Sequence, residues 1–132
     1  MIVIDSSAIV DALVDDPANP DLLALVAGNE LHAPSLLDYE VAGALRGHAL
    51  AERLADEQLQ GAVDDFRGLS IERYPLSSMI QNVLDLRGNF TVYDAAYLVL
   101  AQALEVPLVT ADAKLSEGRK MGVDVQVLRP DR

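Results

Sequence analysis

Carboxylates follow two short apolar segments of the chain, at positions where an α/β enzyme could carry its chemistry. Asp5 comes directly after Ile2-Val3-Ile4, and Asp112 comes three residues after Val109. Ligands of open parallel sheets bind beyond the carboxyl ends of the strands, so both acids are expected near one edge of such a sheet. Aspartate is also a favoured N-cap residue, and helix capping explains either acid when it is considered alone.

Glu40 lies within the apolar stripe of an expected helix. At about 100° per residue, it falls between Leu36 and Ala44 on that stripe. An unpaired carboxylate that faces a core is costly or becomes protonated. The position therefore favours a role in a site, and an ion pair with Arg46 or another arginine is the structural alternative.

Asp94 lies at the start of another expected helix, because Thr91-x-x-Asp94 has the spacing of a capping box. Residues 95–101 are apolar without interruption, which is typical of a buried helix. The first turn of this helix is therefore expected within the fold rather than in bulk solvent. Capping and metal binding are compatible here, because one carboxylate can do both.

The chemistry of gathered carboxylates favours a hard divalent cation. Neighbouring acids raise one another's pKa unless a cation lies among them. The sequence contains no cysteine, which excludes a thiol nucleophile, a disulfide framework and a zinc finger. Oxygen ligands without sulfur favour Mg²⁺ or Mn²⁺.

Hydroxyl residues lie beside both strand-end acids: Ser7 follows Asp5 closely, and Thr110 precedes Asp112. They could stabilise turns and caps, or they could donate hydrogen bonds to a ligating carboxylate. His32 is close to a strand end and His48 lies on an apolar stripe, so both are expected to be structural or surface residues.

The elements that position these residues alternate between strands and helices. Strands are expected at 2–4, 30–33, 69–73, 107–109 and 123–127. Helices are expected at 8–14, 20–28, 35–50, 56–67, 77–88, 91–104 and, with a turn, 110–119. Helices between strands predict a parallel sheet covered on both faces. We therefore expect one α/β domain over residues 1–132, with a central parallel sheet of about five strands.

The composition fits an acidic, compact protein. Ten basic residues against 21 acidic ones give a net charge of −11, and 51% of residues are hydrophobic. This balance excludes a disordered chain and argues against a protein that coats nucleic-acid phosphates. The longest apolar run, 95–101, is far shorter than the roughly 20 residues of a membrane span. A soluble protein of the cytoplasm is expected, because the chain also starts without a basic leader.

Four short segments together resemble a known family. They are Ile2-Val3-Ile4-Asp5-Ser6-Ser7-Ala8, Leu37-Asp38-Tyr39-Glu40-Val41, Tyr93-Asp94-Ala95-Ala96-Tyr97-Leu98-Val99-Leu100-Ala101 and Leu108-Val109-Thr110-Ala111-Asp112. In this order and spacing, over essentially the whole chain, they resemble the PIN-domain ribonucleases. Within that family they are similar to the VapC toxins of VapBC toxin–antitoxin pairs.

The resemblance implies a fold, an activity and partners. It implies a PIN-like domain whose acids meet in one negative pocket and bind Mg²⁺ or Mn²⁺ to cleave single-stranded or looped RNA. It also implies a homodimer and a cognate antitoxin that often inserts a basic side chain into the pocket. Matched by position, the acids are Asp5, Glu40, Asp94 and Asp112, and the supporting hydroxyls are Ser7 and Thr110.

Two other functions remain open from the sequence. A catalytically weak PIN-like protein could act as an RNA- or protein-binding partner, although all four acids are present. A phospho-acceptor signalling domain has similar length and strand-end acids, but it needs an acid doublet and a late lysine. Here Ser6 and Ser7 follow Asp5, and no lysine follows Val127.

Overall fold

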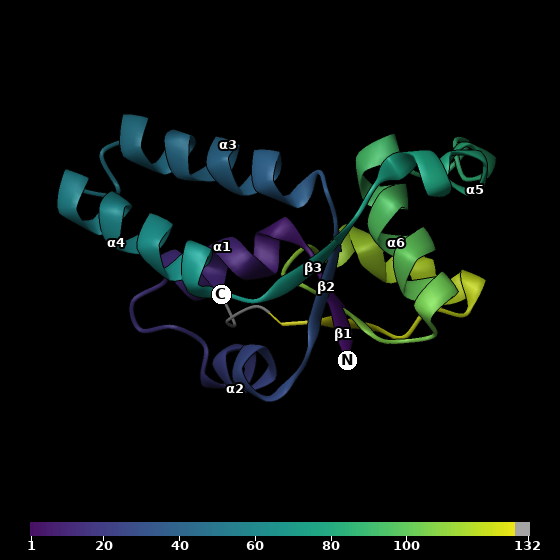
Figure 1. Cartoon of the computed structure of the whole chain (residues 1–132), viewed down its shortest axis with the longest axis horizontal. Helices are drawn as coiled ribbons and strands as arrows, with labels where there is room; N and C mark the ends of the chain where they lie inside the picture. The colour runs from purple at the N-terminus through teal and green to yellow at the C-terminus, as the bar shows by residue number, and fades with distance from the viewer. Residues whose placement is uncertain (129–132) are drawn as a thin grey trace.

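A five-stranded parallel β-sheet runs through the centre of the protein in the computed structural model, which describes residues 1–128 (Figure 1). The strand order is β3-β2-β1-β4-β5, and every pair is parallel. The strands are β1 (Ile2–Ile4), β2 (Leu31–Pro34), β3 (Ile71–Tyr74), β4 (Leu108–Thr110) and β5 (Val125–Val127). The prediction of a parallel α/β sheet of about five strands is confirmed. The last four residues of the expected domain, 129–132, lie outside the described part.

The two short apolar segments that precede Asp5 and Asp112 form the neighbouring strands β1 and β4, inside the sheet. All residues of β1 and β4 are buried. Ile4 pairs with Val109, and the Asp5 amide donates to the Val109 carbonyl at 3.1 Å. This register brings the carboxyl ends of β1 and β4 side by side, and the residues that follow each strand therefore meet.

Helices cover both faces of the sheet (Figure 1). On one side α6 packs on β1, β2 and β4, while α1 packs on β4 and on three other helices on the other side. None of the helices among residues 1–128 is long and apolar enough to cross a membrane. The helices are α1 (Ser6–Val14), α2 (Pro20–Gly28), α3 (Leu37–Leu50), α4 (Asp56–Gly68), α5 (Ile80–Asp85) and α6 (Val92–Leu104), with 3₁₀ helices η1 (Leu76–Ser78) and η2 (Ala113–Met121).

Two expected helices differ from the structure. The helix expected from 35 begins only at Leu37, and Ser35 lies in a turn before it rather than at its cap. The helix expected over 77–88 is divided into η1 and the short α5. The Ser78 hydroxyl donates to the Pro75 carbonyl at 2.9 Å, and such local bonds compete with a continuous helix.

The half-buried alternation expected over residues 69–73 holds at Leu69 and Ile71 but not at Arg73. Leu69 caps α4 instead of starting a strand, and β3 begins at Ile71. Arg73 is exposed on the edge strand β3, and its guanidinium pairs with Asp38 of α3 at 2.8 Å. Likewise, Val123 precedes β5 rather than belonging to it.

Gly118 is the point at which η2 fits closely against α6. A Cβ atom at Gly118 would overlap Leu98 Cδ2, and the Leu98 side chain is fully buried and cannot easily move. We expect Gly118→Ala to lower the free energy of unfolding by about 1–3 kcal/mol, measured by urea denaturation.

A matched glycine provides the control for this substitution. Gly61 lies within α4, and a Cβ there meets nothing within 4 Å. Gly61→Ala is expected to raise stability by up to about 1 kcal/mol, because alanine is the better helix former. Equal effects of the two substitutions would contradict the close seating of η2 on α6.

Candidate active site

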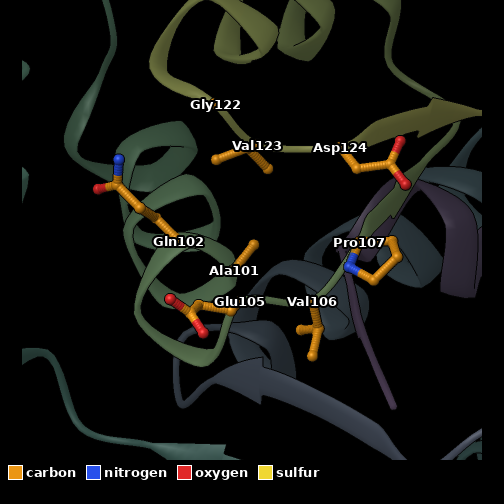
Figure 2. A pocket seen from close by; sticks show the side chains of 8 residues that line it. All are labelled: Ala101, Gln102, Glu105, Val106, Pro107, Gly122, Val123 and Asp124. Atoms are coloured by element: carbon orange, nitrogen blue, oxygen red, sulfur yellow. The ribbon is translucent and has the colours of Figure 1, made fainter.

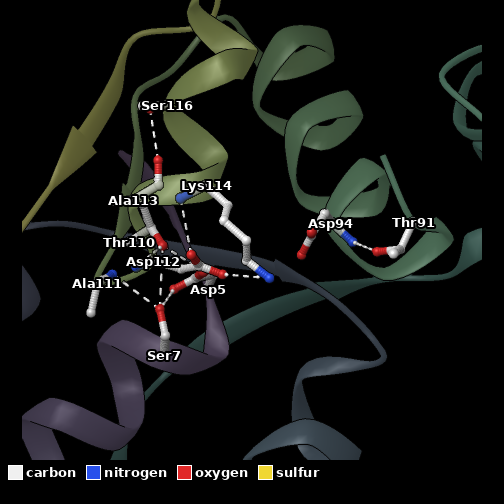
Figure 3. A network of polar contacts seen from close by, with 10 residues as sticks. All are labelled: Asp5, Ser7, Thr91, Asp94, Thr110, Ala111, Asp112, Ala113, Lys114 and Ser116. Carbon is white, nitrogen blue, oxygen red and sulfur yellow. Dashed lines mark hydrogen bonds and ion pairs between the residues drawn. The ribbon is translucent and has the colours of Figure 1, made fainter. Parts of the chain in front are cut away.

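Asp5 is fixed between the end of β1 and the start of α1. Its Oδ1 accepts hydrogen bonds from the Ala8 amide at 3.1 Å and the Ser7 hydroxyl at 2.7 Å. Its Oδ2 accepts from the Thr110 hydroxyl at 2.7 Å (Figure 3). The residue is only 4% exposed, so the carboxylate is both buried and fully oriented. Asp5 therefore caps α1, as the structural alternative predicted, and also lies at the predicted edge of the sheet.

The two predicted supporting hydroxyls join the loop after β4 to the start of α1. Ser7 Oγ accepts from the Ala111 amide at 3.0 Å, and Thr110 Oγ1 accepts from the Asp112 amide at 2.9 Å. The two hydroxyl oxygens lie 3.2 Å apart. Both residues therefore position backbone and carboxylate together, which holds Asp112 close to Asp5.

Asp112 and Asp94 complete the group of acids at this edge. Asp112 caps η2 by accepting from the Lys114 amide at 3.0 Å. In α6 the cap is Thr91, whose hydroxyl accepts from the Asp94 amide at 3.1 Å. The half-buried Asp94 carboxylate is therefore not used for capping. Figure 3 shows the Lys114 side chain extending between Asp112 and Asp94, and its Nζ lies 3.6 Å from Asp112 Oδ2.

The electrostatics of these acids are coupled. Burial raises the pKa of Asp5 to about 6, against the lowering effect of the Thr110 and Ser7 hydrogen bonds. Burial also raises the pKa of Asp94, and the Lys114 charge opposes this increase. The negative charge of Asp112 raises the pKa of both residues. Like-charge repulsion of this kind is relieved by a cation bound among the acids.

Glu40 has a partner that the sequence did not indicate. Its Oε1 accepts a hydrogen bond from the Tyr97 hydroxyl at 2.6 Å, rather than pairing with Arg46. Tyr97 is 2% exposed, and burial together with the Glu40 charge raises the pKa of its phenol. The charge of Asp5 adds to this increase, so the Glu40–Tyr97 pair lies within the field of Asp5. A buried tyrosine hydroxyl needs a partner, and this was the available signal.

The donor set fits a hard cation, although the acids are not already arranged as its ligands. Within residues 1–128, no three acidic or histidine side chains form a ready metal-ligating group. Mg²⁺ usually keeps several waters and takes only one or two carboxylates, so it does not need three direct ligands. The oxygen-only donors, and the negative charge of Asp112 near both Asp5 and Asp94, are compatible with such a site.

The histidines have partners elsewhere, as predicted for structural or surface residues. His32 is buried between the Tyr74 hydroxyl at 2.7 Å and Glu30 at 2.8 Å. His48 accepts from Arg53 Nε at 3.0 Å. These bonds use both ring nitrogens of His32 and Nδ1 of His48.

A separate pocket lies at the opposite end of β4 from the acids (Figure 2). It is bordered by Pro107, which precedes the strand, and by the acids Glu105 and Asp124. Gln102, on another side, donates to the Met121 carbonyl at 3.0 Å. Asp124 therefore carries the same charge as the acids of the candidate site but borders a pocket at the opposite end of β4.

Similarity to known proteins identifies the class to which this fold and its group of acids belong. The PIN-domain family matches residues 2–120. Two solved structures share the fold: PAE2754 from Pyrobaculum aerophilum (TM-score 0.65, 24% identity, 94% of this chain and 89% of that chain) and FitAcB from Neisseria gonorrhoeae (TM-score 0.58, 17% identity, 95% and 96%). The chain therefore belongs to the PIN-domain family.

The curated relatives define its place within that family. Ribonuclease VapC1 of Mycobacterium tuberculosis is 39% identical over 129 residues, which cover 96% of this chain and 97% of the relative. Ribonuclease VapC9 of the same species is 39% identical over 117 residues, covering 89% and 90%. Within the family, then, this is a VapC-type ribonuclease.

Proposed function

We propose that the protein is a Mg²⁺- or Mn²⁺-dependent endoribonuclease toxin that cleaves RNA at the edge formed by β1, β4 and α6. The observation that carries the proposal is the placement of Asp5, Asp94 and Asp112 in one electrostatically coupled group. Similarity to VapC ribonucleases at 34–39% identity supports the nuclease activity. Asp5, Glu40 and Asp94 would hold the cation directly or through water, Asp112 would complete the group, and Ser7 and Thr110 would support these carboxylates.

The chain's own side chains have distinct roles in this proposal. Ser7 donates to Asp5 Oδ1, which also accepts from the Ala8 amide, and Thr110 donates to Oδ2, so the carboxylate is held in a fixed direction. Tyr97 orients Glu40 in the same way. A divalent cation held by these residues would supply an activated water and neutralise charge that develops on the phosphate. Lys114 lies close enough to Asp112 to contact the same phosphate group.

The proposed partners follow from shape and charge. Asp5 is recessed, and a splayed single strand reaches a recessed site better than duplex nucleic acid does. An antitoxin with a basic side chain would be attracted to the coupled acids. Exposed apolar side chains on α5 and at the start of α6 support a homodimer through a second copy of the chain: Ile80, Leu84, Val92 and Tyr93. We place this activity in the cytoplasm, where RNA is abundant.

Purified protein incubated with total RNA tests the proposal. Discrete fragments are expected with Mg²⁺ or Mn²⁺, and none are expected with EDTA. Sequencing the fragment ends would identify the target. Equal cleavage with EDTA would contradict the metal dependence, and intact RNA in every lane would favour a catalytically weak RNA- or protein-binding role.

A further inference from the structure

We propose that two adjoining pockets beside the acids form a track for single-stranded RNA, which determines where the RNA is cut. This inference rests on the proposed ribonuclease function and adds the residues that select the substrate. The track is defined by Asn89, Phe90, Asp94, Lys114, Glu117 and Lys120.

The track begins at the candidate active site. A pocket of about 500 Å³ lies between η2 and the segment that connects α5 to α6, and Asp94 and Lys114 are part of its wall. A second pocket of about 470 Å³ reaches Lys120. Both pockets share Asn89, Phe90 and Glu117, so they form one continuous surface that starts at the acids.

Two lysines among the lining residues of the track can contact a phosphate backbone, although Asp94 and Glu117 also line it. Lys114 and Lys120 are the only two lysines in a chain of net charge −11, and both line this surface. Their side chains are 78% and 83% exposed, so a ligand can reach both ammonium groups, although Lys114 lies 3.6 Å from Asp112. Lys120 is paired with Glu117 at 2.7 Å, so that contact limits the charge available at the far end.

The residues between the two lysines suit unpaired bases. Phe90 lines both pockets and is partly buried against the core, so its ring is held in place. Aromatic rings of this kind stack bases of single strands. The exposed Asn89 side chain has no hydrogen-bond partner within residues 1–128, and its amide can both donate to and accept from a base edge. An aromatic ring, a free amide and flanking lysines favour RNA over a protein partner.

Binding of a labelled single-stranded RNA of mixed sequence in EDTA tests the track without cleavage. Lys120→Gln is expected to weaken binding roughly threefold and to lower the salt slope by about 0.7. Glu117→Gln frees Lys120 and is expected to tighten binding. Phe90→Leu is expected to weaken binding about tenfold, with folding checked by circular dichroism. Arg67→Gln, an exposed charge on α4, is the matched control and is expected to bind like the wild type.

Cleavage mapping with Mg²⁺ separates this proposal from the proposed function. Asn89→Ala is expected to cut RNA with an altered base preference at one position beside the cut. If the wild type cleaves RNA but Asn89→Ala keeps its cut sites and Lys120→Gln binds like Arg67→Gln, the track proposal is overturned. The ribonuclease function would stand in that case, because it depends on the acids and not on the track.

Discussion

Replacing Asp94 with asparagine is expected to reduce kcat/KM for RNA cleavage by about 10²–10³-fold. The substitution removes one negative charge from the coupled group of acids but keeps the size of the side chain. The fold should persist, because the cap of α6 uses the Thr91 hydroxyl and the Asp94 backbone amide. Single-turnover cleavage of a labelled oligonucleotide, together with the thermal midpoint of each protein, measures both effects.

Asp124→Asn is the control for charge in this experiment. Asp124 is exposed and borders the pocket at the opposite end of β4, so its removal makes the same charge change away from the acids. Its cleavage rate is expected to equal that of the wild type. A wild-type rate for Asp94→Asn, or an equal loss in both variants, would contradict the assignment of Asp94 to the site.

Asp5→Asn is expected to stabilise the metal-free protein above pH 6 while removing RNA cleavage. The pKa of Asp5 is about 6 in the folded protein against an ordinary value of 3.8, because burial disfavours the charged form. The folded state therefore binds the proton more tightly, and stability falls as pH rises from about 4 to about 6. An increase of about two pKa units corresponds to up to about 3 kcal/mol, which the neutral amide avoids.

Urea unfolding in EDTA across this pH range measures the difference. The wild type and Asp5→Asn should be similarly stable below pH 3.8, where the wild-type carboxyl is neutral in both states, and diverge as pH rises. Added Mn²⁺ should stabilise the wild type and leave the variant nearly unchanged. A variant less stable than the wild type at every pH would show that the hydrogen bonds of Asp5 outweigh its burial.

The parts of the fold that the sequence predicted well are those with strong local patterns. β1, residues 108–109 of β4 and residues 95–101 of α6 are uninterrupted apolar runs, which predict burial. The structure buries all of them. The prediction failed where tertiary contacts decide the outcome. Arg73 lies on the edge strand β3 and pairs with Asp38, and the helix expected over 77–88 is divided into η1 and α5.

In the candidate site, too, local patterns predicted some residues, and tertiary contacts determine the others. The positions of Asp5, Thr110 and Asp112 were predictable because strand ends in a parallel sheet meet at one edge. The pairing of Ile4 with Val109 then brings these three residues together. The Tyr97 partner of Glu40 depends on the packing of α6 against α3, which sequence spacing does not specify. The contact of Lys114 Nζ with Asp112 Oδ2 at 3.6 Å likewise depends on the path of η2, which sequence spacing does not specify.

The most direct test of the account is a titration of Mn²⁺ followed by electron paramagnetic resonance, with RNA cleavage measured in the same samples. For the wild type, bound Mn²⁺ and cleavage should rise together and saturate at the same Mn²⁺ concentration. In Asp5→Asn both should be lost. Cleavage that persists in EDTA, or Mn²⁺ binding and cleavage that survive in Asp5→Asn, would contradict a metal-dependent site built on these acids.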